Sequence, residues 1–92
     1  MHGVVVTVNI EPGHGDEARA QLENNVVPRV RETPGVITGH WLSSPDGRQG
    51  LSVIIYENEE TAKAAADMIP NAPRPDFVTF DKIEVREVVA HI

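Results

Sequence analysis

The order in which β-branched runs and helical periodicities follow one another limits the possible folds more than any other feature of this sequence. The run VVVTVNI over residues 4–10 is too short and too rich in β-branched residues for a helix, and Pro12 and Gly13 punctuate its end. Residues 16–33 then carry an apolar side chain at every fourth position: Ala18, Leu22, Val26 and Val30. This spacing predicts an amphipathic helix directly after a strand.

Pro28 lies inside that helical pattern. A proline supplies no backbone N–H, and its ring crowds the carbonyl group four residues earlier, which here belongs to Asn24. We therefore expect the helix to kink or loosen near its last turn.

The rest of the sequence predicts three more strands and a second helix. Pro34 and Gly35 end the helix, and a strand over 36–42 is followed by a turn at Pro45, Asp46 and Gly47. A third strand is expected over 51–57, and Asn58 is a candidate cap for a second helix that contains Ala62, Ala65, Ala66 and Ile69. After a loop that contains Pro70, Pro73 and Pro75, residues 77–90 predict a long final strand.

The chain is therefore expected to form one α+β domain over residues 1–92 with the order β-α-β-β-α-β, a ferredoxin-like fold. This fold has a four-stranded antiparallel sheet in the order 4-1-3-2, with two helices on one face. The two strands predicted at the centre, 4–10 and 51–57, are the most apolar, while the final strand, an edge, carries five charged residues: Asp81, Lys82, Glu84, Arg86 and Glu87.

Alternation along the strands predicts which residues share a face. Val4, Val6, Val8 and Ile10 are expected beneath the helices, with Val5, Thr7 and Asn9 on the open face. The same reasoning places Leu51, Val53 and Ile55 under the helices, and Ser52, Ile54 and Tyr56 on the open face. Since an open face with this much apolar surface is typical of an interface, we expect a second copy to cover it as a homodimer.

Composition excludes several classes of protein. The formal net charge of −6 disfavours binding to nucleic acid, and no apolar run is long enough to cross a membrane. The absence of cysteine excludes disulfides and thiolate metal sites, so we expect a cytoplasmic protein. The four histidines are dispersed, without the spacing of metal ligands, and we predict no metal site.

Three stretches of the chain resemble a known family: EPGHGDEARAQLE, TPGVITGHWLSSPDG and LSVIIYENEETAKAAA. They resemble the dimeric α+β barrel superfamily and, within it, the antibiotic biosynthesis monooxygenase-like (ABM) domains. The resemblance implies a dimeric α+β barrel and places the site in its interior. It does not fix the activity, because the superfamily includes cofactor-free monooxygenases, haem-degrading enzymes, isomerases and stress-response proteins.

Haem-degrading members have an asparagine in the first strand, an aromatic residue at the end of the third and a histidine beyond the second helix. Only the aromatic position is matched, by Tyr56, where those members have tryptophan. Val6 or Thr7 stands nearest to the asparagine position, and the stretch ETAKAAADMIPNAPRPD, which contains the second helix and the loop after it, has no histidine. The resemblance therefore favours a protein without haem, and we expect no cofactor.

Four residues are candidates for substrate binding. Trp41 follows His40 on a predicted strand, so the two side chains face opposite sides, and the tryptophan fits a dimer interior or interface better than His40 fits beneath a helix. Tyr56 and Asn9 are expected to point into one interior, where packing and a polar contact to substrate are competing interpretations. Arg74, between Pro73 and Pro75, could meet an anionic ligand from a stiff loop.

Two hypotheses follow from the sequence. The first is a cofactor-independent monooxygenase-like enzyme that acts on an aromatic or lipophilic small molecule, whose catalytic residues the sequence does not identify. The second is a non-catalytic module for small-molecule binding or interaction.

Overall fold

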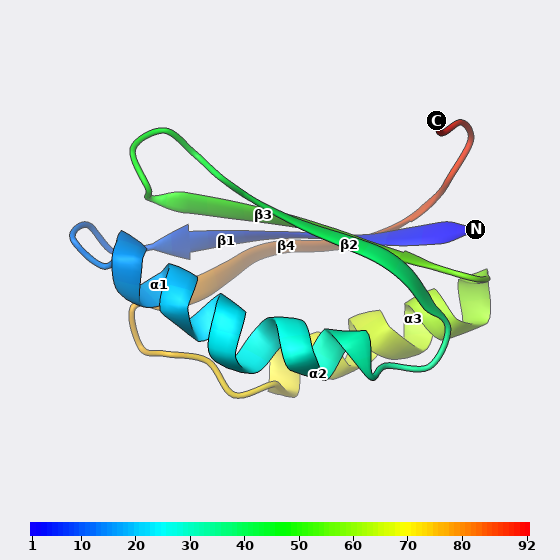
Figure 1. Cartoon of the computed structure of the whole chain (residues 1–92), viewed down its shortest axis with the longest axis horizontal. Helices are drawn as coiled ribbons and strands as arrows, with labels where there is room; N and C mark the ends of the chain where they lie inside the picture. Colours follow the sequence, from blue (N-terminus) through cyan, green and yellow to red (C-terminus); the bar gives the residue numbers. More distant parts are fainter.

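The computed structural model describes all residues, 1–92, as a four-stranded antiparallel sheet with the helices on one face (Figure 1). The strand order β2-β3-β1-β4 is the predicted order, so the ferredoxin-like α+β fold is confirmed. The elements are β1 (His2–Ile10), α1 (Gly15–Gln21), the π-helical turn η1 (Leu22–Val26), α2 (Val27–Arg31), β2 (Val36–Ser43), β3 (Gln49–Tyr56), α3 (Glu59–Met68), the 3-10 turn η2 (Ile69–Asn71) and β4 (Val78–Glu87).

Differences from the expected boundaries are small and lie at element ends. The hairpin between β2 and β3 is tighter than expected, because Asp46 accepts hydrogen bonds from the Ser44 hydroxyl (2.7 Å) and the backbone N–H of Arg48 (3.0 Å). These bonds hold the pKa of the Asp46 carboxyl below its usual 3.8, the Arg48 N–H having the larger effect. Strand β4 ends at Glu87, three residues short of the expected end, and the tail leads away from the sheet (Figure 1).

The first helical segment, 15–31, contains the loosening that Pro28 predicts. It takes the form of η1, a π turn that ends two residues before the proline. In a regular α-helix, apolar residues at every fourth position drift by about 40° per step around the axis. A π turn is wider, so it reduces the drift between Leu22 and Val26 and keeps the apolar side chains directed at the sheet.

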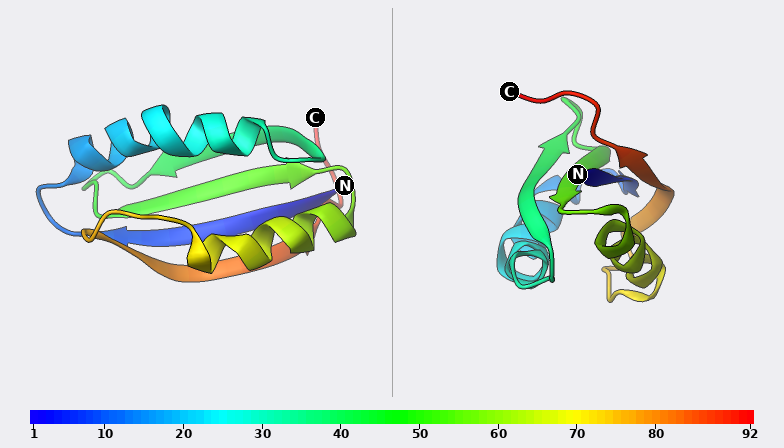
Figure 2. Two further views of the ribbon diagram at one scale, coloured as in Figure 1. Left: turned by 90° about the horizontal axis from the view of Figure 1, so that it is seen from below. Right: turned by 90° about the vertical axis from the view of Figure 1, so that its right-hand side faces the viewer.

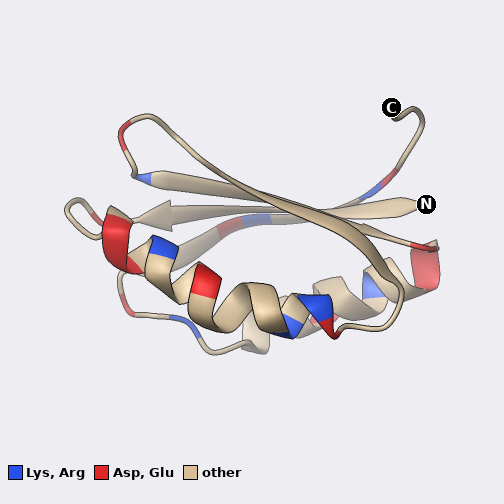
Figure 3. Cartoon of the chain, in the orientation of Figure 1, with Lys and Arg blue, Asp and Glu red and all other residues tan.

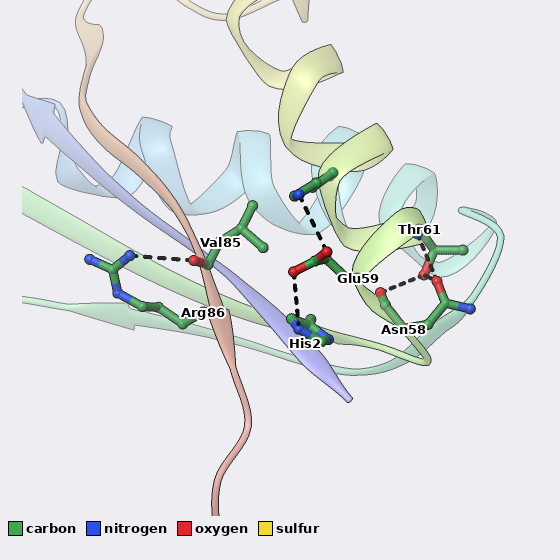
Figure 4. Close-up of polar contacts among 7 residues, drawn as sticks. His2, Asn58, Glu59, Thr61, Val85 and Arg86 are labelled. Carbon is green, nitrogen blue, oxygen red and sulfur yellow. Dashed lines mark hydrogen bonds and ion pairs between the residues drawn. The ribbon is translucent and has the colours of Figure 1, made fainter.

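Helix α3 is short and closely packed. The Asn58 side chain accepts a hydrogen bond from the backbone N–H of Thr61 (2.9 Å), which confirms the predicted cap (Figure 4). Ala62 is fully buried and Ala65 is buried as well. Because alanine side chains are small, α3 can approach the sheet closely, and it forms the core together with Val4, Val6, Ile54 and Tyr56.

The predicted faces are right for β1 and wrong for β3. Val4 lies opposite Ile54 in the β1–β3 pairing, and both side chains are buried beneath the helices. Ile54 and Tyr56 therefore lie on the helix-covered face, while Leu51, Val53 and Ile55 lie on the open face. The inversion has a simple cause: both faces of β3 are apolar, so alternation alone gives two solutions, and only the register with β1 selects between them.

The two helical segments lie side by side, with β1 and β3 visible between them (Figure 2). Helix α3 lies close to β1, β3 and β4, whereas α1, η1 and α2 keep a greater distance from the strands. Charged residues gather on the helices, the loops and β4, leaving most of β1, β2 and β3 uncharged (Figure 3). None of the helices has the length and apolar character needed to cross a membrane.

Candidate functional site

A groove of about 300 Å³ lies where the first helical segment stands away from the sheet. Its helical wall consists of Gly15, Ala18, Arg19, Leu22, Glu23 and Val27. The sheet contributes Ile10, Trp41, Leu42, Ser43 and Gly50, and the hairpin contributes Gly47. The lining is half apolar, with Trp41 as its one aromatic residue, and this volume suits a small organic molecule.

One glycine leaves space on the sheet side of the groove, and another lies against the Trp41 ring. Gly50 faces the helices from β3 and contributes no side chain. On β2, a methyl group at Gly39 would lie 3.1 Å from Cη2 and Cζ3 of Trp41, which shows that the indole ring lies back over Gly39. The ring therefore covers the strand instead of filling the groove.

The β2–β3 hairpin approaches the start of α1 at one end of the groove. A Cβ atom on Gly15 would lie 3.8 Å from the carbonyl oxygen of Gly47. Gly47 has a φ of 72°, a left-handed conformation that favours glycine at this turn. The hydrogen bonds to Asp46 described above lie in the same hairpin, so bonds within the turn fix this wall of the groove.

The charged residues that line the groove are Arg19 and Glu23, both exposed and one helical turn apart. They offer a cation and a carboxylate to polar groups at the edge of a ligand. No histidine lines the groove, and no three His, Asp or Glu side chains converge where a metal ion could bind. The groove residues therefore do not fit haem, because no histidine, cysteine, methionine or tyrosine among them could ligate its iron.

The structure places Trp41 and His40 on opposite faces of β2, as predicted, and settles the side of each, which alternation within the strand left open. Trp41 lies opposite Ser52, which in turn lies opposite Val6, so these three residues form one line on the helix-covered face. His40 pairs with Val53 and is exposed on the open face. The sequence favoured a dimer interior or interface for Trp41, whereas the register places it on the helix-covered face of its own chain, where it lines the groove.

Tyr56 and Asn9 do not point into one interior. Tyr56 is 3% exposed and belongs to the core beneath α3, while Asn9 is exposed on the opposite face of the sheet. Burial raises the pKa of the Tyr56 phenol above its usual value of 10.0. The expectation that these two side chains converge is wrong, because the register with β1 places Tyr56 on the face of the sheet opposite to Asn9.

Arg74 lies apart from the groove. Its guanidinium donates a hydrogen bond to the carbonyl oxygen of Val78 and lies over the ring of Phe80, 5.7 Å from the ring centre. These contacts fasten the proline-rich loop to the start of β4. Of the four predicted binding residues, only Trp41 lines the groove.

The helical wall of the groove was not among the predicted site residues. Its apolar members, Ala18 and Leu22, are part of the four-residue repeat that indicates a helix, and such a repeat is typical of core packing. A signal was nevertheless present: Arg19 and Glu23 flank that repeat at the same spacing. The distance between helix and sheet cannot be read from spacing, so the sequence does not distinguish a groove from a packed core.

The chain is therefore a ferredoxin-like α+β protein with a groove between its first helical segment and the sheet. Residues 1–68 match the family described as antibiotic biosynthesis monooxygenase, and the chain belongs to this family. A comparison with curated proteins gives no significant match.

Several solved structures share the fold over nearly the whole chain. The haem-degrader MhuD from Mycobacterium tuberculosis, solved with two haems in its active site, has a TM-score of 0.80 at 19% identity, covering 100% of this chain and 99% of MhuD. The monooxygenase ActVA-Orf6 of Streptomyces coelicolor, solved with nanaomycin D, has a TM-score of 0.64 at 16% identity, with 99% and 89% covered. A dimeric ferredoxin-like protein from an uncultured marine organism has a TM-score of 0.67 at 11% identity, with 100% and 98% covered.

Proposed function

We propose that this protein binds a small aromatic or lipophilic molecule in the groove between its first helical segment and the sheet. The observation that carries the proposal is the groove itself, whose floor holds the chain's only tryptophan and whose edge holds Arg19 and Glu23. Membership of the monooxygenase family supports an oxygenation of that molecule. We propose that this oxygenation needs no cofactor.

A reaction of this kind requires the substrate to supply electrons to oxygen, and removal of a proton from the substrate favours this step. Glu23 is the one carboxylate that lines the groove, so it is our candidate for the proton acceptor. The second hypothesis, a binding module without catalysis, is favoured by a different observation: Glu23 is exposed, and no other acid or base lines the groove except Arg19.

A ligand screen with matched variants tests the proposal. Aromatic compounds are screened by thermal shift, and hits are titrated against wild type, Trp41→Ala and Asn9→Ala. Loss of the indole should weaken binding by about 1–3 kcal/mol, while Asn9→Ala, on the open face, should have no effect. Equal binding to all three proteins contradicts the groove as the site.

Oxygen consumption separates the two hypotheses. A hit that is bound and consumes oxygen supports the enzyme, and Glu23→Gln should then slow consumption at least tenfold while leaving binding intact. A hit that is bound without oxygen consumption supports the binding module.

We also propose that a second copy of the chain covers the open face of the sheet. We propose the cytoplasm as the compartment, because the chain has no cysteine. Leu42 and Leu51 are 52% and 38% exposed there, beside Val5, Val53 and Ile55. Sedimentation at micromolar concentration should give twice the chain mass of 10.1 kDa, and Leu51→Lys should give the monomer. A wild-type monomer at this concentration contradicts the proposal.

A further inference from the structure

The start of the first helical segment is held by few contacts. No side chain caps α1 at His14, and Ala18 is the one buried residue of this helix. Helix α1 and η1 also lie further from the strands than α3 does. Segments that bury little apolar surface are the first to open in a native protein.

Helix α1 lies between two points where the backbone can turn. The chain leaves β1 and runs outward past the end of the sheet before α1 begins (Figure 2). In this turn Gly13 has a φ of 86°, and no atom of a non-adjacent residue lies within 4 Å of the place where its Cβ would stand. On the other side of α1, the π turn η1 interrupts the regular helix, and helices bend at such turns.

The far end of the segment is fixed. The carbonyl oxygen of Gly35 accepts a hydrogen bond from the backbone N–H of Glu57 (2.8 Å). A Cβ atom on Gly35 would lie only 2.9 Å from Cγ2 of Thr61, so the chain packs tightly against α3 here. Any opening of the segment is therefore confined to the end that carries α1.

A stack of two rings fastens the start of α1 to the rest of the protein. The rings of His14 and Phe77 have their centres 4.5 Å apart and their planes 11° apart. The carbonyl oxygen of Phe77 accepts a hydrogen bond from the N–H of Glu11 (2.9 Å), which ties Phe77 to the end of β1. The second contact of His14, between Nδ1 and Oε1 of Glu17 (2.9 Å), lies within the helix start and moves with it.

We propose that the stack of His14 on Phe77 is a latch that controls access to the groove. When the stack breaks, α1 rotates on Gly13 and η1 away from the sheet. Because Gly15 and Ala18 line the groove, this motion opens the groove at the end where Gly15 lies near Gly47. The control of access rests on the proposed function, whereas the opening of α1 needs no ligand.

Four variants test the latch. His14→Ala removes one ring and no cap bond, and Phe77→Leu removes the other ring but keeps an apolar side chain. His14→Phe keeps a ring for stacking without the bond to Glu17, so it separates the two contacts of His14. His91→Ala, in the exposed tail, is the control, and thermal melts establish that all four variants fold.

The first readout, hydrogen exchange followed by mass spectrometry, needs no ligand. His14→Ala and Phe77→Leu should each speed exchange over residues 15–26 by about tenfold and leave α3 unchanged. The double variant should exchange no faster than either single variant, because both substitutions remove the same contact. His14→Phe and His91→Ala should stay within about twofold of wild type.

Three results overturn the latch, whatever the protein binds. The first is unchanged exchange over residues 15–26 in folded His14→Ala. The second is an equal acceleration over α3, because it shows a general loss of stability. The third is fast exchange in His14→Phe, because the bond to Glu17 and not the stack would then hold α1.

The second readout measures access with the aromatic probe 8-anilinonaphthalene-1-sulfonate in stopped-flow experiments. Energy transfer from Trp41, the only tryptophan, detects the bound probe, and Ala18→Leu, which fills the groove, should abolish the signal from the groove. His14→Ala should raise the association and dissociation rate constants together, each by about tenfold, and leave Kd within about twofold. A latch has this effect because it changes the barrier to entry and exit and not the contacts of the bound probe.

The outcomes separate the latch from the proposed function. If wild type gives no signal that Ala18→Leu abolishes, binding in the groove and the control of access are rejected together, while exchange still decides whether the stack holds α1. If exchange responds as expected but both rate constants stay unchanged, the groove stands as the binding site and the control of access is overturned. A change in Kd through one rate constant alone also overturns it, because His14 would then contribute to the bound state.

Discussion

The two helical segments that cover the same face of the sheet are built in opposite ways. Helix α3 begins with a side-chain cap at Asn58 and packs closely through Ala62 and Ala65. The first segment begins at His14 without such a cap, is interrupted by a π turn and lies further from the strands. The groove lies under the first segment and lacks any α3 residue.

This contrast suggests a division of roles between the two helical segments: α3 contributes mainly to stability, and the first segment to the proposed binding. Its small side chains let α3 pack closely on β1 and β4, and the Asn58 cap fixes its first turn. Both features stabilise the fold. The first segment carries larger side chains such as Leu22 and Val27, which hold its backbone away from the strands and line the space that results. We therefore expect substitutions beneath α3 to change stability and substitutions beneath the first segment to change binding.

The largest effect is expected from a charge placed in the shared core. Val6 is 6% exposed and belongs to the core cluster, so Val6→Asp would bury a carboxylate without a partner. The cost of several kcal/mol is comparable with the whole stability of a small domain, and the variant should not fold. Circular dichroism checks this, with Asn9→Asp on the open face as a control that should fold normally.

The fold was predictable from the sequence because it depends on the order of strands and helices and on the spacing of their apolar residues. The β-branched runs, the Asn58 cap and the charged β4 edge each indicate their element and its place in the sheet. The loosening before Pro28 was predictable too, since it follows from a missing N–H and a steric clash.

The candidate site was less predictable, because it depends on register and on distance. Ile54 and Ile55 are the same residue type, so nothing local shows which of them faces the helices, and the positions of Tyr56 and Trp41 depend on the answer. Gly50 gave no sequence signal as a groove residue, since a glycine in a strand reveals the space beside it only when the neighbouring strands are in place.

The second prediction compares the two helices through one substitution, alanine to leucine. Ala62 is fully buried in the core cluster, so Ala62→Leu should destabilise the protein by about 1–3 kcal/mol through overpacking. Ala18 is 7% exposed but borders the groove, so the added side chain in Ala18→Leu can occupy that volume. Its stability should change by less than about 1 kcal/mol, whereas binding of an aromatic hit from the ligand screen should be lost.

Chemical denaturation measures the first effect and calorimetry the second. Ala64→Leu, exposed on α3, serves as a control for the helix itself. Equal destabilisation by Ala62→Leu and Ala18→Leu would show that the two segments are packed alike, and the contrast between them would be wrong.

The third prediction concerns the helix ends and interiors. Asn58→Ala removes the cap of α3 and should cost about 1 kcal/mol of unfolding free energy. Asn25 lies in η1, where its side chain donates a hydrogen bond to Oε1 of Gln21 on the exposed surface, so Asn25→Ala should cost less than about 0.5 kcal/mol. Urea denaturation of both variants checks the order, and a larger loss for Asn25→Ala would contradict the assignment of stability to α3.

The smallest effect at neutral pH, and the one that most sharpens the contrast, concerns Tyr56 beneath α3. Burial raises the pKa of its phenol above 10.0, so the folded protein favours the neutral form. Below pH 10 the phenol is neutral in both states and contributes no pH dependence. As the pH rises above 10, the unfolded chain loses this proton first, so unfolding is favoured and stability falls until the pH passes the folded pKa.

Tyr56 is the only tyrosine, so an absorbance titration reports this group alone, and Tyr56→Phe should show a weaker loss of stability above pH 10 than wild type. A phenol that titrates at the same pH in folded and denatured protein would show that water reaches the space beneath α3 as it reaches the groove, and the two segments would then differ less than their packing indicates.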